Sequence, residues 1–363
     1  MATSHQTSAP LQQATWPNRD TLFVDDNAFQ AYLLQGVSRT FALTIPQLPS
    51  SLCRAVSNAY LLCRTVDTIE DEPALDLVSK EHFCHQYVAA LKGQLASEAF
   101  AAELAPRLSD RTLPLEILLV RSTPRILTIT RSLNPVQQEA LVTCVEGMAR
   151  GMVEFQGVAG LAGLKDLAHL DRYCYFVAGI VGEMLTRLFC DYSPAIARHH
   201  SRLMPLAVSF GQGLQMTNIL KDIWEDRARG VCWLPRTVFP GLTGGELTPG
   251  RPGFEPGLET LLGIAHGHLC NALEYTLLIP PRERGIRSFC LWAIAMALLT
   301  LRKINARRDF SSGHQVKITR HSVRATAVVG RLTVEQDWLL HRLFEQLARP
   351  LPSPPPEVLR PCS

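Results

Sequence analysis

The chain has 363 residues, of which 47% are hydrophobic and 19% are charged, and its formal net charge is only +3. This composition allows a large buried core, and the small charge argues against a strongly basic, nucleic-acid-binding protein. The ten cysteines are scattered, without a C-x-x-C pair or the spacing of zinc ligands, so we expect buried thiols in a reducing compartment.

The N-terminal segment, residues 1–25, is polar and interrupted by prolines, and it lacks the basic start and apolar stretch of a secretory signal. We expect a flexible arm there. The longest strongly apolar run, residues 289–301, is shorter than a bilayer-spanning helix and fits a core helix better. These features predict a cytoplasmic protein and leave peripheral contact with a membrane open.

Apolar residues recur with helical spacing along most of the chain, and no segment shows the convincing alternation of a strand. The first predicted helix spans residues 50–71, with Ser50 or Ser51 as its cap and Pro73 as its stop. Further helices are predicted at residues 136–156, 169–190, 202–227, 258–278, 286–307 and 334–348.

Two long segments interrupt this pattern. Residues 239–257 are rich in Gly and Pro, and residues 307–324 are polar and basic, so we expect both to be loops. Residues 349–363 form a proline-rich tail in which we expect no helix. The sequence therefore predicts a single all-α domain, residues 26–348, between an arm and a tail.

The first predicted helix ends with three carboxylates in five positions. At about 100° per residue, Tyr60, Arg64, Asp67 and Asp71 fall within about 60° of one another, and Glu70 lies beside them. Most of this helix is apolar, so it carries one narrow line of polar groups.

A similar stripe of Gln215, Asn218, Asp222 and Asp226 occurs 155 residues later along the chain. A solvated acidic face would explain either stripe alone. Two such stripes, each embedded in apolar sequence, favour a shared function instead, because unpaired carboxylates are costly to desolvate.

Oxygen-only ligands suit a hard cation, and loosely spaced carboxylates suit Mg²⁺ that is shared with substrate phosphates. Mg²⁺ between two facing stripes would neutralise a diphosphate leaving group, so that a carbon–oxygen bond can ionise. Further groups for the phosphates are expected from Ser38, Arg39 and Thr40 in "SRTF", and from Arg64 and Lys221 beside the carboxylates.

The order and spacing of "SRTF", "RTVDTIED", "GMVEF", "YCYFVAGIVGEMLTRLF" and "QMTNILKDIWED" resemble the squalene and phytoene synthase family, the head-to-head prenyl transferases. The resemblance covers roughly residues 28–330. It implies the all-α isoprenoid-synthase helical bundle with a central cavity. It also implies Mg²⁺ ligands on both sides of that cavity, which are Asp67, Glu70 and Asp71 facing Asp222 and Asp226.

From the resemblance we also expect a site for prenyl diphosphate substrate, formed by residues of both regions. These residues are Ser38, Arg39, Thr40, Phe41, Tyr60, Arg64, Gln215, Asn218 and Lys221. The family places a proton-handling tyrosine at the position of Tyr173, although a buried core tyrosine is the alternative. Gly179 and Gly182 either leave room for a prenyl chain or allow close helix packing.

The sequence departs from the family after the second acidic motif. The family commonly has Gly-Arg there, whereas this chain has Gly230 followed by Val231. Arg227 or Arg229 could supply the missing charge, and the sequence does not decide between them.

The stretch "HQVKITRHSVRA", residues 314–325, resembles the Val-Lys-Ile-Arg loop of squalene synthases, with Thr319 at the position of the loop arginine and Arg320 one place later. The resemblance implies that NADPH contacts Lys317 and Arg320, together with Arg39 and Arg64. A basic surface loop is the alternative.

The resemblance thus implies Mg²⁺-dependent condensation of two farnesyl diphosphates to presqualene diphosphate, followed by NADPH-dependent rearrangement to squalene. A phytoene- or dehydrosqualene-type reaction without reductant is the first alternative. A non-catalytic lipid-binding or assembly protein of the same fold is the second, although both acidic motifs are intact. The sequence does not determine the oligomeric state.

Overall fold

The structure is a computed structural model that describes residues 25–359 except 39, 159, 240–248 and 250–252, and it omits the side chains of 320, 324 and 327. The predicted arm therefore lies outside the described residues apart from its last residue. The described chain is helical, and its one extended pairing is a β-bridge between Leu164 and Pro235. The expectation of an all-α fold is confirmed.

The α-helices are α1 (Asp26–Val37), α2 (Phe41–Thr44), α3 (Ser50–Asp71), α4 (Leu77–Leu91), α5 (Ser97–Leu104), α6 (Pro114–Arg121), α7 (Thr123–Arg131), α8 (Pro135–Gln156), α9 (Leu167–Cys174), α10 (Ile180–Tyr192), α11 (Pro194–Ala197), α12 (His200–Lys221), α13 (Ile223–Ala228), α14 (Phe254–Leu278), α15 (Arg284–Ala306), α16 (Gly313–Val316), α17 (Arg320–Thr333) and α18 (Asp337–Ala348).

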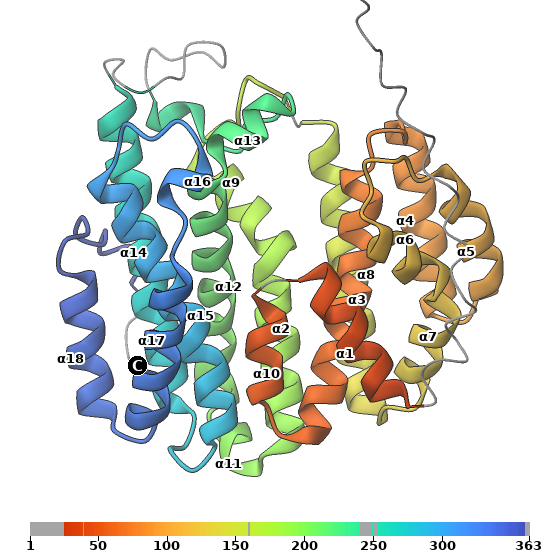
Figure 1. Cartoon of the computed structure of the whole chain (residues 1–363), viewed down its shortest axis with the longest axis horizontal. Coiled ribbons are helices and arrows are strands. Elements are labelled where there is room, and N and C mark those ends of the chain that lie inside the picture. The colour runs from red at the N-terminus through yellow and green to blue at the C-terminus, as the bar shows by residue number, and fades with distance from the viewer. Residues whose placement is uncertain (1–24, 39, 159, 240–248, 250–252, 360–363) are drawn as a thin grey trace, which may run out of the picture.

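α10 and α12 lie at the centre of the bundle, and the other long helices run alongside them (Figure 1). α3 and α8 pack against α10, whereas α14 and α15 pack against α12. The short helices α9, α13 and α16 gather at one end, the upper end in Figure 1. This arrangement brings the C-terminal end of α3 and the junction of α12 with α13, where the two acidic motifs lie, to the same end of the bundle.

The helix predicted at residues 50–71 has these bounds in the structure, but its cap differs from the prediction. The N-cap is Pro49, and no side chain caps the helix. Ser50 and Ser51 already belong to the first turn, so the prediction of a serine cap was wrong. The helix ends at Asp71, just before Pro73, whose ring disfavours helical backbone at the preceding residue.

The segment predicted as one helix at 169–190 is α9 and α10 joined by a π-helical turn, Tyr175–Gly179. Gly182 of this segment and Gly211 of α12 allow close packing, and both also line an internal cavity. A Cβ atom on Gly182 would lie 2.1 Å from the Ala207 carbonyl oxygen, and one on Gly211 would lie 2.2 Å from the Ala178 oxygen. Gly182 therefore allows α10 and α12 to approach each other.

The helix predicted at 202–227 is interrupted, because α12 ends at Lys221 and α13 begins at Ile223. The bend at Asp222 coincides with a close approach of the short helix α16. A Cβ atom on Gly313, the first residue of α16, would lie 2.9 Å from the Lys221 carbonyl oxygen.

The loop predicted at 307–324 is partly wrong, because α17 starts at Arg320. Its N-cap is Thr319, whose side chain accepts a hydrogen bond from the Ser322 amide, 3.1 Å away. This capping pattern was the signal that the sequence reading missed. The prediction also missed α1 and the helices α4 to α7, and it placed the start of α18 three residues early.

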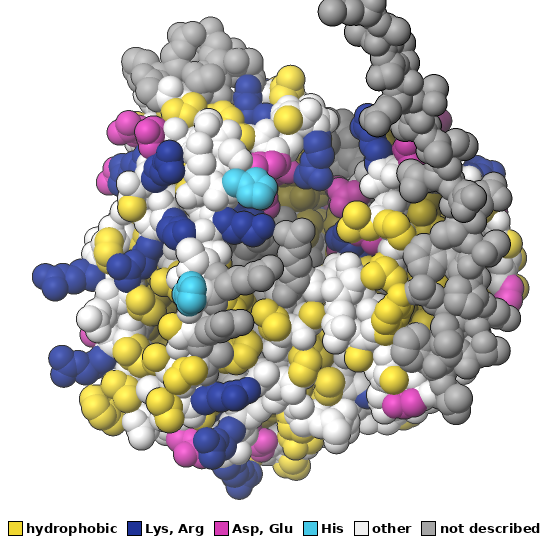
Figure 2. All heavy atoms as spheres, in the orientation of Figure 1, with side chains coloured by type: hydrophobic (Ala, Val, Ile, Leu, Met, Phe, Trp, Pro, Cys, Tyr) yellow, Lys and Arg dark blue, Asp and Glu magenta, His cyan; other side chains and the backbone are white. Residues whose placement is uncertain are grey.

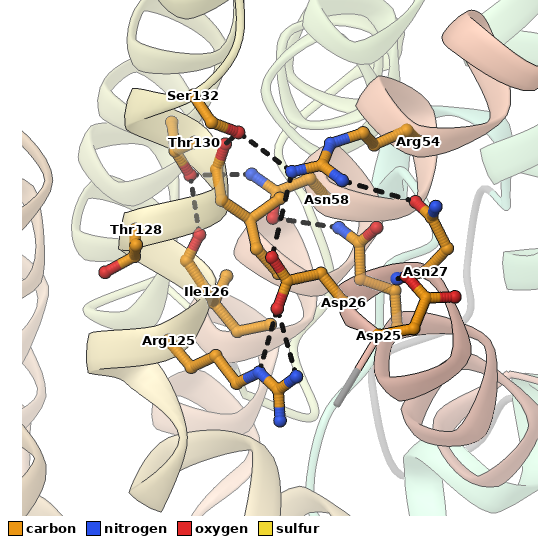
Figure 3. Close-up of polar contacts among 12 residues, drawn as sticks. Asp25, Asp26, Asn27, Arg54, Asn58, Arg125, Ile126, Thr128, Thr130 and Ser132 are labelled. Carbon is orange, nitrogen blue, oxygen red and sulfur yellow. Dashed lines mark hydrogen bonds and ion pairs between the residues drawn. The ribbon is translucent and has the colours of Figure 1, made fainter. Parts of the chain in front are cut away.

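Polar contacts anchor α1 to the rest of the bundle (Figure 3). Arg125 of α7 donates to Asp26 over 3.0 Å, and Arg54 of α3 approaches the same carboxylate at 3.8 Å. Deeper in the interface, Asn58 donates to Thr130 over 2.6 Å. The same Asn58 accepts a hydrogen bond from Gln30 of α1 over 3.1 Å, so α1, whose C-terminal end leads directly into the "SRTF" segment, is held against α3 and α7.

The described part of the proline-rich tail packs against α14. His266 donates to the Pro352 carbonyl over 2.9 Å, and Asn271 donates to the Val358 carbonyl over 2.9 Å. A Cβ atom on Gly263 would lie 2.9 Å from the Ser353 carbonyl oxygen, so this glycine leaves room for the tail. The tail therefore covers a face of α14 that would otherwise expose polar groups.

Within the described residues, two helical segments are long and apolar enough to cross a membrane by length and composition. They are Leu167–Tyr192 and Arg284–Ala306, and 50% and 61% of their most apolar windows are buried within the bundle. Both segments also contribute residues to the wall of an internal cavity, so the fold itself uses their apolar character.

Candidate active site

A cavity of about 270 Å³ lies in the centre of the bundle. Its wall is mostly apolar, and Asp67, Gln215 and Asn218 are among its few polar residues. The apolar part is formed chiefly by Phe41, Ile45, Val56, Met148, Val177, Val181, Met184, Leu185, Phe189, Phe210, Leu214 and Phe289. Figure 2 shows the hollow on this face, with hydrophobic side chains inside and acidic side chains beside it. Such a cavity suits a long apolar ligand with a charged end.

The carboxylates of the first acidic motif have too little compensating charge. Burial raises the pKa of Asp67 to about 7, with Asp71 and Glu116 adding to the effect and Arg64 opposing it. Burial, Asp71 and Asp67 raise the pKa of Glu70 to about 8. Desolvated carboxylates that repel one another favour a proton or a cation, which is the electrostatic requirement of a metal site.

Arg64 lies between Asp67, which lines the cavity, and the carboxylate of Glu116. It forms a short ion pair with Glu116 of α6, and its Nη1 atom lies 3.6 Å from Asp67. Burial alone would lower the pKa of Arg64, but Asp67 and Glu116 raise it above its ordinary value. Arg64 is thus a fixed cation beside the first motif, where a diphosphate could bind.

The second motif has its own basic partners. Lys221 lies 3.1 Å from Asp222 and donates to Asn218 over 3.3 Å. Asp226 is buried, and Arg229 donates to it over 2.5 Å. Burial raises the pKa of Asp226, with Arg229 opposing this and Asp222 and Asp71 adding to it.

The two motifs face each other. Arg229 joins them, since one of its nitrogens binds Asp226 and another lies 3.8 Å from Asp71. Among the described residues, no three His, Cys, Asp or Glu side chains converge as a preformed metal site. Mg²⁺ needs only one or two protein carboxylates plus water and phosphate oxygens, so facing carboxylates with raised pKa values fit this ion.

The "SRTF" segment borders the cavity mouth. Ser38 accepts a hydrogen bond from the Phe41 amide over 3.0 Å, and Tyr60 donates to the Val37 carbonyl over 3.2 Å. The rings of Phe41 and Tyr60 are 5.2 Å apart, and both line the cavity. Thr40 is exposed, and Arg39 lies outside the described residues.

Tyr173 is buried and stacks on Trp233, with ring centroids 4.0 Å apart and an interplanar angle of 10°. Burial raises the pKa of its hydroxyl, and the nearby charges of Glu70, Asp226 and Asp67 raise it further. Among the described residues the hydroxyl has no hydrogen-bond partner. Tyr173 therefore places a protonated phenol near both acidic motifs.

Residues 311–319, which we call the basic loop, are held against the second motif. The Gly313 amide donates to Glu225 over 2.9 Å, and Ser312 donates to the same oxygen over 3.3 Å. Lys317 is exposed, and its carbonyl accepts from the Lys303 ammonium over 2.5 Å. The side chain of Arg320 lies outside the described part of the structure, so its predicted contact with NADPH stays a prediction.

The structure brings together residues that the sequence reading did not select. Glu116 fixes Arg64, Glu225 holds the basic loop, and Trp233 packs on Tyr173. Arg229 is the arginine that reaches both acidic motifs, whereas Arg227 contacts Cys232. The contact of Arg229 with Asp226 follows the i,i+3 spacing of a helix, but the contacts of Glu116, Glu225 and Trp233 join elements that are distant in the sequence, so no spacing rule could have found them.

The chain belongs to the squalene/phytoene synthase family, whose family description matches residues 34–322. It is 29% identical over 297 residues to the squalene synthase of Eremothecium gossypii, covering 80% of this chain and 65% of the relative. It is 30% identical over 299 residues to the squalene synthase of Saccharomyces cerevisiae, covering 79% of this chain and 63% of the relative. The chain thus spans somewhat less than two thirds of these relatives.

Solved structures show the same fold. A ligand complex of TcSQS matches with a TM-score of 0.69 and 23% identity, covering 89% of this chain and 92% of the other. A dehydrosqualene synthase in complex with a ligand matches with a TM-score of 0.59 and 18% identity, covering 85% and 96%. The helical-bundle fold that the family resemblance implied is therefore confirmed.

Proposed function

We propose that this chain is a squalene synthase, which condenses two farnesyl diphosphates to presqualene diphosphate and then reduces and rearranges this intermediate to squalene. The observation that carries the proposal is the apolar cavity with two facing acidic motifs at its mouth. The names of the curated relatives support the same reaction.

The cavity wall would bind the prenyl chains, and polar groups at the mouth would bind the diphosphates. Asn218, Lys221 and Arg64 carry donors that can reach phosphate oxygens from both sides. Asp67, Glu70, Asp71, Asp222 and Asp226 would hold Mg²⁺. When bound, Mg²⁺ would neutralise the diphosphate as it leaves, which lowers the barrier to ionisation.

Tyr173 would handle the proton that the first condensation releases. Its phenol lies near both motifs and its raised pKa keeps it protonated, so it can donate a hydrogen bond to a leaving diphosphate oxygen. The departing diphosphate can in turn accept a proton that is relayed through the hydroxyl. The apolar wall would exclude water, which would otherwise capture the carbocation as an alcohol.

NADPH would supply hydride in the second half-reaction. Lys317 on the basic loop, with Lys303 beside it, offers the positive charge that dinucleotide phosphates require. Arg39, Arg64 and Arg320 remain proposed partners from the family resemblance. Because Glu225 holds the basic loop against the second motif, this charge lies on the same end of the bundle as the site.

The test is to supply farnesyl diphosphate and geranylgeranyl diphosphate, each with Mg²⁺, with and without NADPH, and to identify the hydrocarbon. Squalene formed only with farnesyl diphosphate and NADPH would support the proposal. The same product with and without NADPH would favour a dehydrosqualene- or phytoene-type enzyme. Failure to release diphosphate under any condition would indicate a non-catalytic protein.

We also propose a cytoplasmic enzyme that contacts a membrane surface peripherally. The exposed hydrophobic residues include Val328, Leu332 and Trp338 on α17 and α18. Figure 2 shows hydrophobic and basic side chains interspersed over this side of the molecule. Such a surface suits contact with lipid headgroups. A membrane beside the enzyme would also take up the proposed hydrocarbon product, which is insoluble in water.

A further inference from the structure

Arg229 occupies the position between the two acidic motifs where a cation is required. Its Nη2 atom is 2.5 Å from Asp226 Oδ1, and its Nη1 atom is 3.8 Å from Asp71 Oδ1. The two carboxylates come from α3 and α13, so this guanidinium links the two halves of the site.

The backbone holds Arg229 in place while its side chain can leave. Arg229 is the C-cap of α13, and its amide donates to the carbonyls of Glu225 and Asp226 over 3.2 and 3.0 Å. Its side chain is 63% exposed, whereas the Asp226 side chain is only 9% exposed. The guanidinium can therefore rotate into solvent without disturbing the helix, and the buried carboxylate cannot follow it.

A guanidinium and a divalent cation cannot both bind the same carboxylate oxygens. Each neutralises Asp226 and Asp71, and their positive charges repel one another at short distance. We propose that Arg229 is a built-in counter-ion, which holds the two acidic motifs together in the metal-free protein and is displaced when a divalent cation binds. This inference rests on the proposed metal site but goes beyond it.

The experiment measures Mn²⁺ binding by the electron paramagnetic resonance signal of free Mn²⁺, without substrate and with the full chain. Arg229→Gln is compared with wild type and with Arg227→Gln, which removes the same charge two residues away, where the side chain contacts Cys232. We expect Arg229→Gln to bind Mn²⁺ about 3- to 10-fold more tightly, because the competing cation is gone. Arg227→Gln should change the affinity less than 2-fold.

Thermal unfolding gives an independent readout. In EDTA, Arg229→Gln should unfold at a lower temperature than wild type, because the two acidic motifs lose the guanidinium that contacts both of them and their carboxylates repel each other. Saturating Mn²⁺ should reduce this difference. Circular dichroism at 20 °C, which should match wild type, would show that the variant is folded.

The outcomes separate the two proposals. If wild type binds Mn²⁺ and Arg229→Gln binds it equally or more weakly, the counter-ion inference is wrong and the metal site stands. Equal tightening in both variants would mean a general charge effect, which also overturns the inference. If none of the three proteins binds Mn²⁺, the proposed metal site itself fails.

Discussion

The chemistry of this site depends on a few carboxylates that the fold holds close together with incomplete compensation. Asp67 and Glu70 have pKa values of about 7 and 8, so near neutral pH they are only partly ionised in the metal-free protein. A group of this kind destabilises the folded state once it ionises. The site therefore stores unfavourable electrostatic energy that a bound cation would relieve.

Asp67→Asn should stabilise the metal-free protein at pH 8 and abolish turnover. The pKa of Asp67 is raised from 3.8 to about 7 in the folded protein. The free energy of unfolding of wild type therefore falls progressively as pH rises through this range. Removing the charge should recover about 1–2 kcal/mol at pH 8 and almost nothing at pH 4. Thermal unfolding in EDTA at both pH values checks this.

The matched control is Asp110→Asn at an exposed position, which should leave both stability and turnover near wild type. Turnover of Asp67→Asn within tenfold of wild type would contradict its role as a metal ligand. Equal stability of Asp67→Asn and wild type at pH 8 would show that Asp67 carries no electrostatic strain.

Tyr173→Phe should retain its fold and its substrate affinity but lose about 10²- to 10⁴-fold in turnover, because the ring can still stack on Trp233 while the hydroxyl is gone. Steady-state kinetics with farnesyl diphosphate would separate KM from kcat. Tyr192→Phe, at a partly exposed position on α10, is the control. Normal turnover of Tyr173→Phe would make Tyr173 a core residue.

At the scale of elements, the central pair α10 and α12 shapes the cavity because the two backbones approach closely. The approach depends on Gly182 and Gly211, each of which faces a carbonyl oxygen of the other segment. The π-helical turn Tyr175–Gly179 lies beside this contact and lines the cavity with Val177 and Ala178. Such turns frequently occur at functional sites.

Gly182→Ala should destabilise the protein by about 2 kcal/mol or more, because the new Cβ atom would lie 2.1 Å from a backbone oxygen that cannot move alone. Gly157→Ala is the control, since no atom lies within 4 Å of its Cβ position and its backbone is helical. Urea unfolding monitored by circular dichroism measures both. Equal stability of the two variants would show that α10 and α12 can separate without loss.

The basic loop should matter for the reductant and not for the first condensation. Lys317→Ala should raise the apparent KM for NADPH about tenfold, because one charged contact to a phosphate is lost, and a Lys317/Arg320 double alanine should raise it further. Presqualene diphosphate should accumulate while its rate of formation stays near wild type. Product analysis at limiting NADPH measures both effects.

Lys165→Ala, at an exposed position near α9, serves as the control for the loss of one lysine. Wild-type squalene formation by Lys317→Ala at limiting NADPH would make the basic loop a surface segment. A shift of product toward alcohols in the double variant would support a role of the loop in excluding water.

At the scale of the whole molecule, the bundle is completed by its C-terminal segment. Residues 349–359 cover α14, and the buried polar groups of His266 and Asn271 bind carbonyls of this segment. Asn271 also donates to Ser209 of α12 over 2.8 Å. The tail is thus coupled through one buried side chain to a helix that lines the cavity.

Removal of residues 352–363 should lower the free energy of unfolding by about 1–3 kcal/mol, because His266 and Asn271 lose partners and apolar surface of α14 is exposed. Thermal unfolding of the truncated chain measures this. The control is a chain that ends at residue 359, which retains the contacts of Pro352 and Val358 and should be as stable as wild type. No change on the longer truncation would mean that the packed segment contributes nothing to stability.

The sequence by itself determined the fold class, the long helices and the two acidic stripes. Residues 50–71 are helical as predicted, because an apolar stripe repeats over six turns and proline bounds the segment. Helices α5 to α7 were missed because segments of 8 or 9 residues are too short to show such a repeat. The 15-residue helix α4 does bury a helical stripe, which includes Phe83, Tyr87 and Leu91, and the prediction overlooked it. Cys63 and Asp67 were assigned to the same helix from spacing alone, and both line the cavity.

Only the tertiary structure decided which side chains meet across the bundle. The pairs Arg64–Glu116, Tyr173–Trp233 and Gly313–Glu225 join elements whose relative rotation no local pattern specifies. The choice of Arg229 over Arg227 depends on where α13 points after the bend at Asp222. Local spacing fixes which residues share a face of one helix, whereas the packing of the whole core sets which faces lie opposite each other.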